Sequence, residues 1–217
     1  MQTIIPNRTV AGHELAEALS SYKNQKNVIV LALPRGGVPI ASEIAEKLNA
    51  PLDLLLVRKL GTPGYSELAM GAIASNGIKF FNEDIVLRYG IHQPELDVVE
   101  KRERLELNRR AQLYRGKRPF PNLNHKIVIL VDDGVATGAT MSVAIEAVKQ
   151  LTPQKIIVAI PVASPDSIEA LRQMADEVIC LLQPSRLSSI GQWYAEFPQV
   201  SDATVINLLN QAWSNES

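Results

Sequence analysis

The chain has 217 residues, of which 46% are apolar and 21% charged, and its formal net charge is −1. These values are typical of one globular domain with a sizeable core, and they exclude the strong positive charge that attracts nucleic acid or an anionic membrane. No apolar run approaches the ~20 residues that span a bilayer, and the first ten residues lack the apolar core of a secretory signal, so we expect a cytoplasmic protein.

The first predicted elements are a helix and a buried strand. Apolar residues recur at helical spacing over residues 8–23, which predicts an amphipathic helix that packs on a sheet. Residues 27–33, NVIVLAL, form an unbroken apolar run of the kind that parallel sheets bury on both faces. A turn with two glycines and one cation follows at residues 34–39, the glycine turn, and a helical apolar face at 40–48. The turn predicts an anion site; a plain turn with a solvated Arg35 is the alternative.

The next apolar run, residues 52–57, predicts another parallel strand. Arg58 and Lys59 follow it directly. Because open α/β sheets bind ligands at the carboxyl ends of their strands, we expect these two cations to contact an anion. Solvated surface charges are the alternative.

Two further patterns separate this strand from the next parallel strand. Apolar runs at residues 70–74 and 78–81 flank Asn76-Gly77, a pair typical of tight hairpin turns. Residues 94–114 then form a long helical pattern of mixed charge, with Glu–Arg pairs four residues apart in the favourable order. This pattern predicts a solvated helix stabilised by ion pairs. The alternatives are an oligomer contact, a basic wall of the active site and an RNA-binding face.

The most informative stretch is residues 128–140, VILVDDGVATGAT. Four apolar residues predict a buried strand, Asp132 and Asp133 stand at its end, and a loop of small residues leads into a helix. The amide groups of the loop and the positive end of the helix suit a single phosphate, to which Thr137 and Thr140 can add hydroxyl donors. Two carboxylates beside a phosphate require a ligand with vicinal hydroxyls, a divalent cation or both, and a ribose 5-phosphate has that shape. A structural turn capped by two acids is the alternative.

The remaining segments continue the alternation of strands and helices. Residues 155–163 and 178–182 predict two more parallel strands, with a helix from Pro165 between them and a last helix near the C-terminus. The sequence therefore predicts a doubly wound α/β fold with a mainly parallel, five-stranded sheet in a single domain, residues 1–217. Cys180 lies inside the last apolar run and is predicted to be a core residue rather than a nucleophile.

Residues 128–140 resemble the phosphoribosyl pyrophosphate signature of the type I phosphoribosyltransferases: apolar residues, two acids, a small-residue loop and Thr-Gly-x-Thr. The glycine turn resembles the pyrophosphate loop of the same family. The resemblance implies Mg²⁺-dependent transfer of a 5-phosphoribosyl group from 5-phosphoribosyl 1-pyrophosphate (PRPP) to a small nitrogenous base, by a homodimer that does not bind nucleic acid. The alternative is a non-catalytic regulatory protein that binds PRPP or a nucleotide on the same fold.

The resemblance also implies roles for individual residues. Asp132 and Asp133, the acid pair, would hold the ribose hydroxyls, directly or through water on magnesium, and would act in catalysis together with Arg35. The 5-phosphate would be bound by the phosphate loop, which consists of Val135, Ala136, Thr137, Gly138, Ala139 and Thr140. The pyrophosphate would be bound by Arg35, Gly36, Gly37, Arg58 and Lys59. In this family the pyrophosphate loop often contains a cis peptide bond, which would fall here between Arg35 and Gly36.

Two further segments are assigned by the same resemblance. The predicted hairpin lies where the family has its mobile catalytic loop, so residues 60–82 would form a flexible lid over the ligand. Residues 183–200 resemble the C-terminal hood that encloses the acceptor base, and are called the hood below. Its candidate acceptor contacts are Leu187, Trp193 and Tyr194, with ordinary packing as the alternative for the two aromatics. The chain departs from purine transferases of the family at Ala136, where these commonly have an aspartate.

Overall fold

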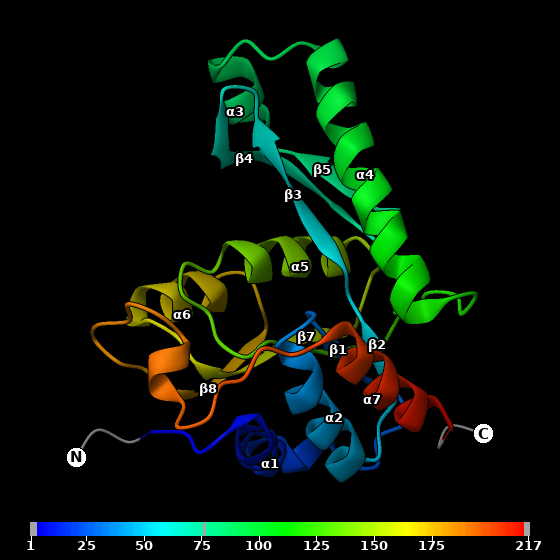
Figure 1. The fold of residues 1–217 in the computed structure, drawn as a ribbon, viewed down its shortest axis with the longest axis vertical. Helices are drawn as coiled ribbons and strands as arrows, with labels where there is room; N and C mark the ends of the chain where they lie inside the picture. Colours follow the sequence, from blue (N-terminus) through cyan, green and yellow to red (C-terminus); the bar gives the residue numbers. More distant parts are fainter. Residues whose placement is uncertain (1–3, 76, 215–217) are drawn as a thin grey trace. The chain divides into compact units, whose positions relative to one another are not determined.

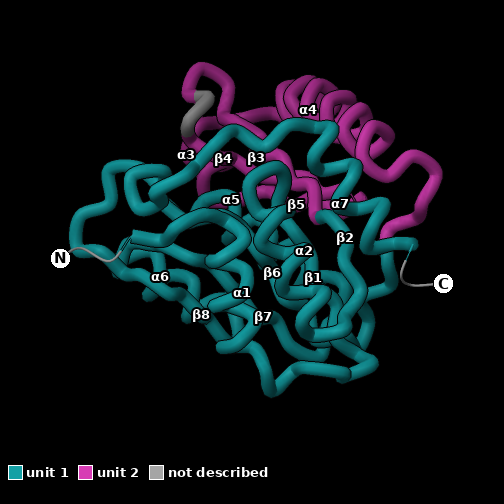
Figure 2. The backbone as a smooth tube through the Cα atoms, turned by 60° about the horizontal axis from the view of Figure 1, so that its bottom comes forward, with its two compact units in different colours: residues 1–54, 121–217 teal, residues 55–120 magenta. Residues whose placement is uncertain are grey.

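The structure, a computed structural model, describes residues 4–75 and 77–214. The chain forms two compact units, which Figure 2 colours separately. Unit 1 consists of Met1–Leu54 and Pro121–Ser217, and unit 2 of Leu55–Phe120.

Unit 1 is built on a parallel sheet of five strands in the order β2-β1-β6-β7-β8. The strands are β1 (Val28–Ala32), β2 (Leu52–Leu54), β6 (Ile127–Val131), β7 (Lys155–Val162) and β8 (Glu177–Leu182). Every residue of β1 and β6 is buried, as expected for continuous aliphatic runs covered on both faces. The predicted doubly wound, five-stranded α/β sheet is thereby confirmed.

Helices cover both faces of this sheet. They are α1 (Arg8–Ala18), α2 (Gly37–Leu48), α5 (Ala139–Lys149), α6 (Pro165–Arg172) and α7 (Asp202–Ser214), with short 3-10 helices η1 (Ser20–Tyr22) and η2 (Gly191–Trp193). In Figure 1, α1 and α2 lie on one side of the sheet, and α5 and α6 on the other. This follows from topology, because right-handed connections that leave β1 and β6 in opposite directions must cross on opposite faces.

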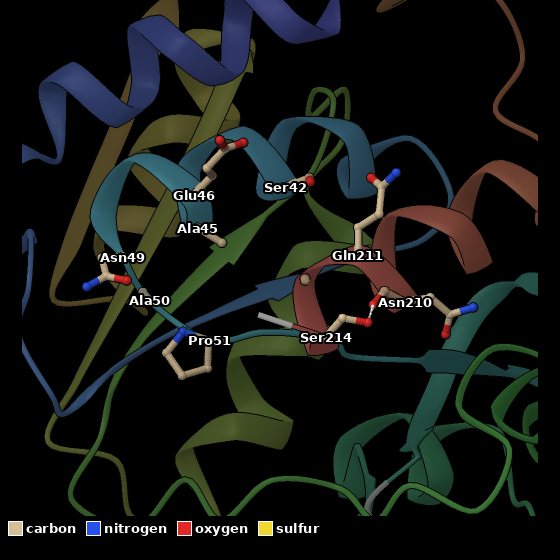
Figure 3. A pocket seen from close by; sticks show the side chains of 10 residues that line it. Ser42, Ala45, Glu46, Asn49, Ala50, Pro51, Asn210, Gln211 and Ser214 are labelled. Carbon is tan, nitrogen blue, oxygen red and sulfur yellow. Dashed lines mark hydrogen bonds between the residues drawn. The ribbon is translucent and has the colours of Figure 1, made fainter. Parts of the chain in front are cut away.

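The sheet edge at β2 is partly covered by α7. The indole Nε1 of Trp213 donates a hydrogen bond of 2.9 Å to the backbone oxygen of Leu52. A polar hollow of about 1000 Å³ lies between α2 and α7, lined mainly by the end of α2, the turn after it and the last turns of α7 (Figure 3). It lies at the end of α2 that is remote from the glycine turn.

Unit 2 contains an antiparallel sheet, β3-β4-β5, and two helices. Its elements are β3 (Val57–Thr62), β4 (Tyr65–Ala74), β5 (Lys79–Phe81), α3 (Glu83–Arg88) and α4 (Gln93–Arg115). The predicted hairpin is present between β4 and β5; its residue Asn76 lies outside the described residues. The predicted ion pairs of α4 are also present, at 2.6 Å for Glu100–Arg104 and 2.7 Å for Glu106–Arg110.

One strand boundary was predicted wrongly. The parallel strand expected over residues 52–57 ends at Leu54, and Arg58 and Lys59 lie inside the antiparallel strand β3 rather than in a loop after β2. The end of the strand could not be recognised in the apolar run, because Leu55 and Leu56 are also buried where the chain leaves the first sheet. In the described part of the chain, no helix is both long and apolar enough to cross a bilayer.

Candidate functional site

The candidate site is formed where β1 and β6 end side by side. These two strands pair in parallel with Ala32 opposite Val131, and the amide of Leu33 donates to the carbonyl of Val131 at 2.8 Å. Since both strands end at the same edge of the sheet, the glycine turn and the acid pair lie next to each other. The structure thus brings together two loops that are about a hundred residues apart in the sequence.

The glycine turn and the acid pair are in contact, and the contact depends on glycine. A Cβ atom on Gly36 would lie 1.9 Å from Oδ2 of Asp133, and one on Gly37 would lie 2.5 Å from the oxygen of Val131. Gly36 has φ −61° and ψ −33°, which any residue can adopt, so it is required for space rather than for conformation. A side chain at either position would push the two loops apart.

The predicted cis peptide bond lies one position away from its expected place. The bond between Pro34 and Arg35 is cis, whereas the prediction placed the cis bond between Arg35 and Gly36.

Asp133 is ion-paired with Arg8, the first residue of α1. Its Oδ2 accepts hydrogen bonds from Nη2 of Arg8 at 2.7 Å and from Nε at 3.1 Å. Both side chains are largely buried, with 9% of the Arg8 side chain and 18% of the Asp133 side chain exposed. Charge-assisted bonds of this kind hold the carboxylate in one orientation.

Asp132 is held by its neighbour's backbone. Its Oδ1 accepts a hydrogen bond of 2.8 Å from the amide of Asp133. Burial, and then the negative charge of Asp133, raise the pKa of Asp132 well above its ordinary value. An opposite charge brought by a ligand would therefore relieve an unfavourable negative charge at this position.

Each acid keeps one oxygen available to a ligand. Oδ2 of Asp132 and Oδ1 of Asp133 receive no hydrogen bond from the described residues. In the described chain, the buried side-chain oxygens that lack a hydrogen-bond partner are those of Thr62 and Ser75. The two carboxylate oxygens of the acid pair are not among them, so they are reached by solvent. Two neighbouring acceptors suit the two hydroxyls of a diol or the water shell of a hard cation.

The hood packs on the acid pair. The hydroxyl of Tyr194 donates to the backbone oxygen of Asp133 at 2.7 Å, and Ile190 fills the space beside Gly134, where a Cβ would lie 2.6 Å from its Cγ2. Burial, together with the negative charge of Asp133, raises the pKa of the Tyr194 phenol, which therefore stays protonated as a donor. Trp193 and Tyr194 are both buried, and Leu187 is half-buried. The predicted acceptor contact of these three residues stays a prediction.

The phosphate loop is anchored at one end and exposed at the other. Val135 is buried and its amide donates to the oxygen of Val162 at 2.9 Å, while Ser167 Oγ donates to the oxygen of Ala136 at 2.9 Å. Gly138 follows with φ +80°, a left-handed conformation that favours glycine, and α5 starts after it without a side-chain cap. The exposed residues of the loop are Ala136, Thr137, Ala139 and Thr140. An uncapped helix start beside exposed amides and hydroxyls is suited to an anion.

The predicted cations occupy different surroundings. In unit 1, Nη1 of Arg35 lies 3.5 Å from Oδ1 of Asp202 at the start of α7, and 38% of its side chain is exposed. In unit 2, Arg58 is ion-paired with Glu103 of α4, and Lys59 is exposed in β3. Their role in binding pyrophosphate stays a prediction.

Arg8 is the site residue that sequence reasoning missed. Residues 8–23 were predicted to serve packing alone. One signal was available: a cation in the first turn of a helix opposes the helix dipole, so it needs a compensating partner elsewhere. The identity of that partner, 125 residues away, could not be read from the sequence.

Comparison with known proteins shows the family of the chain. The family model described as the phosphoribosyl transferase domain matches residues 3–191. Two strains of Mycobacterium tuberculosis have a protein named "putative phosphoribosyl transferase" that is 41% identical over 209 residues, covering 96% of this chain and 47% of that protein. The chain therefore spans about half the length of these curated relatives.

Two solved structures extend the comparison. TT1426 from Thermus thermophilus is 40% identical, with a TM-score of 0.87, over 96% of this chain and 98% of that chain. A purine phosphoribosyltransferase from Pyrococcus horikoshii is 19% identical, with a TM-score of 0.50, over 93% of this chain and 99% of that chain, a similarity of fold alone. From the family match, the identity to its relatives and the fold, the chain belongs to the phosphoribosyl transferase domain family.

Proposed function

We propose that the protein transfers the 5-phosphoribosyl group of PRPP to a nitrogenous base and releases pyrophosphate. The observation that carries this proposal is the contact between the glycine turn and the acid pair at the ends of β1 and β6. A ligand with phosphate groups at two places and a diol between them would suit these loops, and PRPP has this arrangement.

Each group of residues has a role in this reaction. The exposed end of the phosphate loop would bind the 5-phosphate through backbone amides, the start of α5 and the hydroxyls of Thr137 and Thr140. The free oxygens of Asp132 and Asp133 would accept from the ribose hydroxyls. Arg35, with the amide of Gly36, would bind the pyrophosphate and stabilise its charge as it leaves; the amide of Gly37 already donates to the oxygen of Leu33. Positive charge then develops on the sugar ring, which carboxylates close to it stabilise.

The acid pair fits a magnesium ion that arrives with the substrate. Mg²⁺ usually binds proteins through one or two carboxylates, together with waters and substrate phosphates. Asp132 and Asp133 offer this number of carboxylates, and the described residues contain no cluster of three or more acidic, histidine or cysteine side chains that would form a protein cage. When bound, the ion would neutralise charge on the leaving pyrophosphate. Asp132 and Asp133 would hold it directly or through water.

A regulatory protein that binds PRPP or a nucleotide without turnover is the second candidate. Ala136, at the position where related purine transferases have an aspartate, is exposed and has no group that could take a proton from a base. This departure favours either an acceptor that needs no side-chain base or a sensor. Arg58, Lys59, the lid, the hood contacts, the dimer and the cytoplasmic location belong to the proposal as predictions from the resemblance.

The test is pyrophosphate release from PRPP in the presence of Mg²⁺ and a panel of purines, pyrimidines and other nitrogen heterocycles. Turnover with a base supports the transferase. Calorimetric binding of PRPP without turnover supports the sensor, and absence of PRPP binding contradicts both. Asp132→Asn with Asp133→Asn should abolish Mg²⁺-dependent PRPP binding. Glu146→Gln is the matched control, because this carboxylate of α5 pairs with Lys149 on the surface and should not affect binding.

A further inference from the structure

Arg8 connects three segments of unit 1 through a single buried guanidinium. Nε and Nη2 donate to Asp133, while Nη1 donates to the backbone oxygen of Pro198 in the hood at 2.7 Å. The centre of the guanidinium also lies 3.8 Å from the ring centroid of Phe197, a stacking distance. Arg8 therefore contacts the acid pair with one side of its planar group and the hood with the other.

Further hydrogen bonds tie the same three segments together. Ile5, just before α1, donates to the oxygen of Trp193 at 2.9 Å and accepts from the amide of Ala195 at 2.8 Å. Tyr194 lies between these two residues, and its hydroxyl reaches the backbone oxygen of Asp133. The hood is thus joined to the acid pair by two side chains, Arg8 and Tyr194, and is held in register by the N-terminal segment.

The hydrogen bonds of Arg8 determine which carboxylate oxygen of Asp133 stays available to a ligand. Arginine stays charged in proteins and presents its donors in a rigid plane. Both of its hydrogen bonds to Asp133 end on the same oxygen, Oδ2. Oδ1 is then left for the ligand, on the side of the carboxylate that Arg8 does not use. The guanidinium also places a largely buried positive charge beside the two neighbouring acids.

We propose that Arg8 is a positioning residue for the reaction, which aims Asp133 at the ribose and couples the hood to the acid pair. This inference rests on the proposed function, since the ligand is PRPP. Binding of PRPP to the acid pair then further stabilises the hood, through the bonds that Arg8 and Tyr194 make between the two segments. An arginine that served folding alone would not transmit donor binding to residues 191–198.

The test compares the wild-type chain with Arg8→Met and Arg8→Lys, using PRPP with Mg²⁺ as the ligand. Calorimetry should show affinity weakened by at least about tenfold in Arg8→Met, because a charge-assisted contact to Asp133 is lost. Arg8→Lys keeps the charge but not the planar fork, so it should recover part of the affinity. Hydrogen–deuterium exchange should show PRPP-dependent protection of residues 191–198 in the wild type and little in Arg8→Met.

Lys155→Met is the matched control. Lys155 pairs with Glu177 at 2.7 Å and with the hydroxyl of Tyr22 at 2.6 Å, so it resembles Arg8 in chemistry but lies at the opposite end of the sheet. Its loss should lower stability without changing PRPP affinity or protection of the hood. Tyr194→Phe tests the coupling independently of Arg8 and should reduce the protection of residues 191–198, so the coupling can be tested even if Arg8→Met does not fold.

The outcomes separate this inference from the proposed function. If the wild type binds PRPP, and Arg8→Met or Tyr194→Phe retains wild-type hood protection, the coupling is contradicted while the proposed function stands. If Arg8→Met also retains the affinity, its positioning role is contradicted. If the wild type does not bind PRPP, both the inference and the proposed function are contradicted. Weakened affinity together with lost protection, restored in part by Arg8→Lys, supports the inference.

Discussion

Replacing Gly36 by alanine tests the contact between the glycine turn and the acid pair. The dihedral angles of Gly36 suit any residue, so the substitution adds only a methyl group. That methyl would lie 1.9 Å from Oδ2 and 2.3 Å from Cγ of Asp133. Non-bonded atoms at their optimal distance are about 3.5 Å apart, so one of the two loops must move.

Two movements can remove this overlap, and their costs differ. The carboxylate can rotate away, which leaves Arg8 with 8% exposure and without its partner, at a cost of about 3–5 kcal/mol. Alternatively, the loops can separate, as in an overpacked core, at a cost of about 1–3 kcal/mol. The protein adopts the movement with the lower cost, which is the separation of the loops. We therefore expect the free energy of unfolding to fall by about 1–3 kcal/mol. A domain with about 5–15 kcal/mol of stability remains folded after such a loss.

Urea denaturation measures this change as a lower midpoint with an unchanged slope. The matched experiment introduces Gly36→Ala into an Asp133→Ala background, where the overlapping atoms are absent. The cost of the methyl group should then shrink by at least about 1 kcal/mol, which a double-mutant cycle reports as coupling. The contact would be refuted if Gly36→Ala lowered the free energy of unfolding equally in the wild type and in Asp133→Ala, or did not lower it in the wild type.

Three further predictions concern unit 1. Burial raises the pKa of Asp132, so its ionisation opposes folding as the pH rises through that pKa. Asp132→Asn should therefore raise the denaturation midpoint of the ligand-free protein at pH 7. Below about pH 4, where the carboxyl is protonated in both states, the substitution should bring no gain. Burial raises the pKa of the Cys180 thiol to about 11. A disulfide reagent at pH 8 should therefore react with Cys180 about 100-fold more slowly than with an exposed cysteine, and the reaction rate should increase with pH. Reaction at the rate of an exposed cysteine would contradict the burial. Trp213→Phe should lower the free energy of unfolding by about 0.5–1.5 kcal/mol, since the indole bond to Leu52 is lost; an unchanged denaturation midpoint would show that this bond contributes little.

The parallel sheet could be predicted because its central strands are buried on both faces. Residues such as those of β1 and β6 must then be apolar without interruption, and a continuous run is easy to recognise. The loops at the strand ends were also predictable, since glycines, acids and threonines have few structural reasons to occur together there. The acid pair, glycine turn and phosphate loop all lie at the ends of the strands that the sequence indicated.

The sheet of unit 2 was only partly predictable. β3 reads VRKLGT, and only Leu60 and Thr62 of it are buried, so no continuous apolar run marks it as a strand. It forms because β4, which is ten residues long, pairs with it along most of its length. Pairing of this kind is a property of two segments together, and neither segment shows it alone.

The surroundings of the acid pair could not be predicted for a related reason. Arg8, Tyr194 and Pro198 reach Asp133 or its partner from the two ends of the chain. Sequence spacing describes neighbours within one element, whereas these contacts depend on how α1 and the hood pack against the sheet. The family resemblance named the acids but not the residues that hold them.

The anchoring of the phosphate loop has a consequence for the energetics of binding. Bonds from Val135 to the end of β7 and from Ser167 to Ala136 fix the backbone before any ligand arrives. A phosphate that docks there immobilises little additional chain, so the entropy lost on association is small. Ser167, buried beneath the loop and remote from solvent, would then influence affinity through rigidity alone, without touching the ligand.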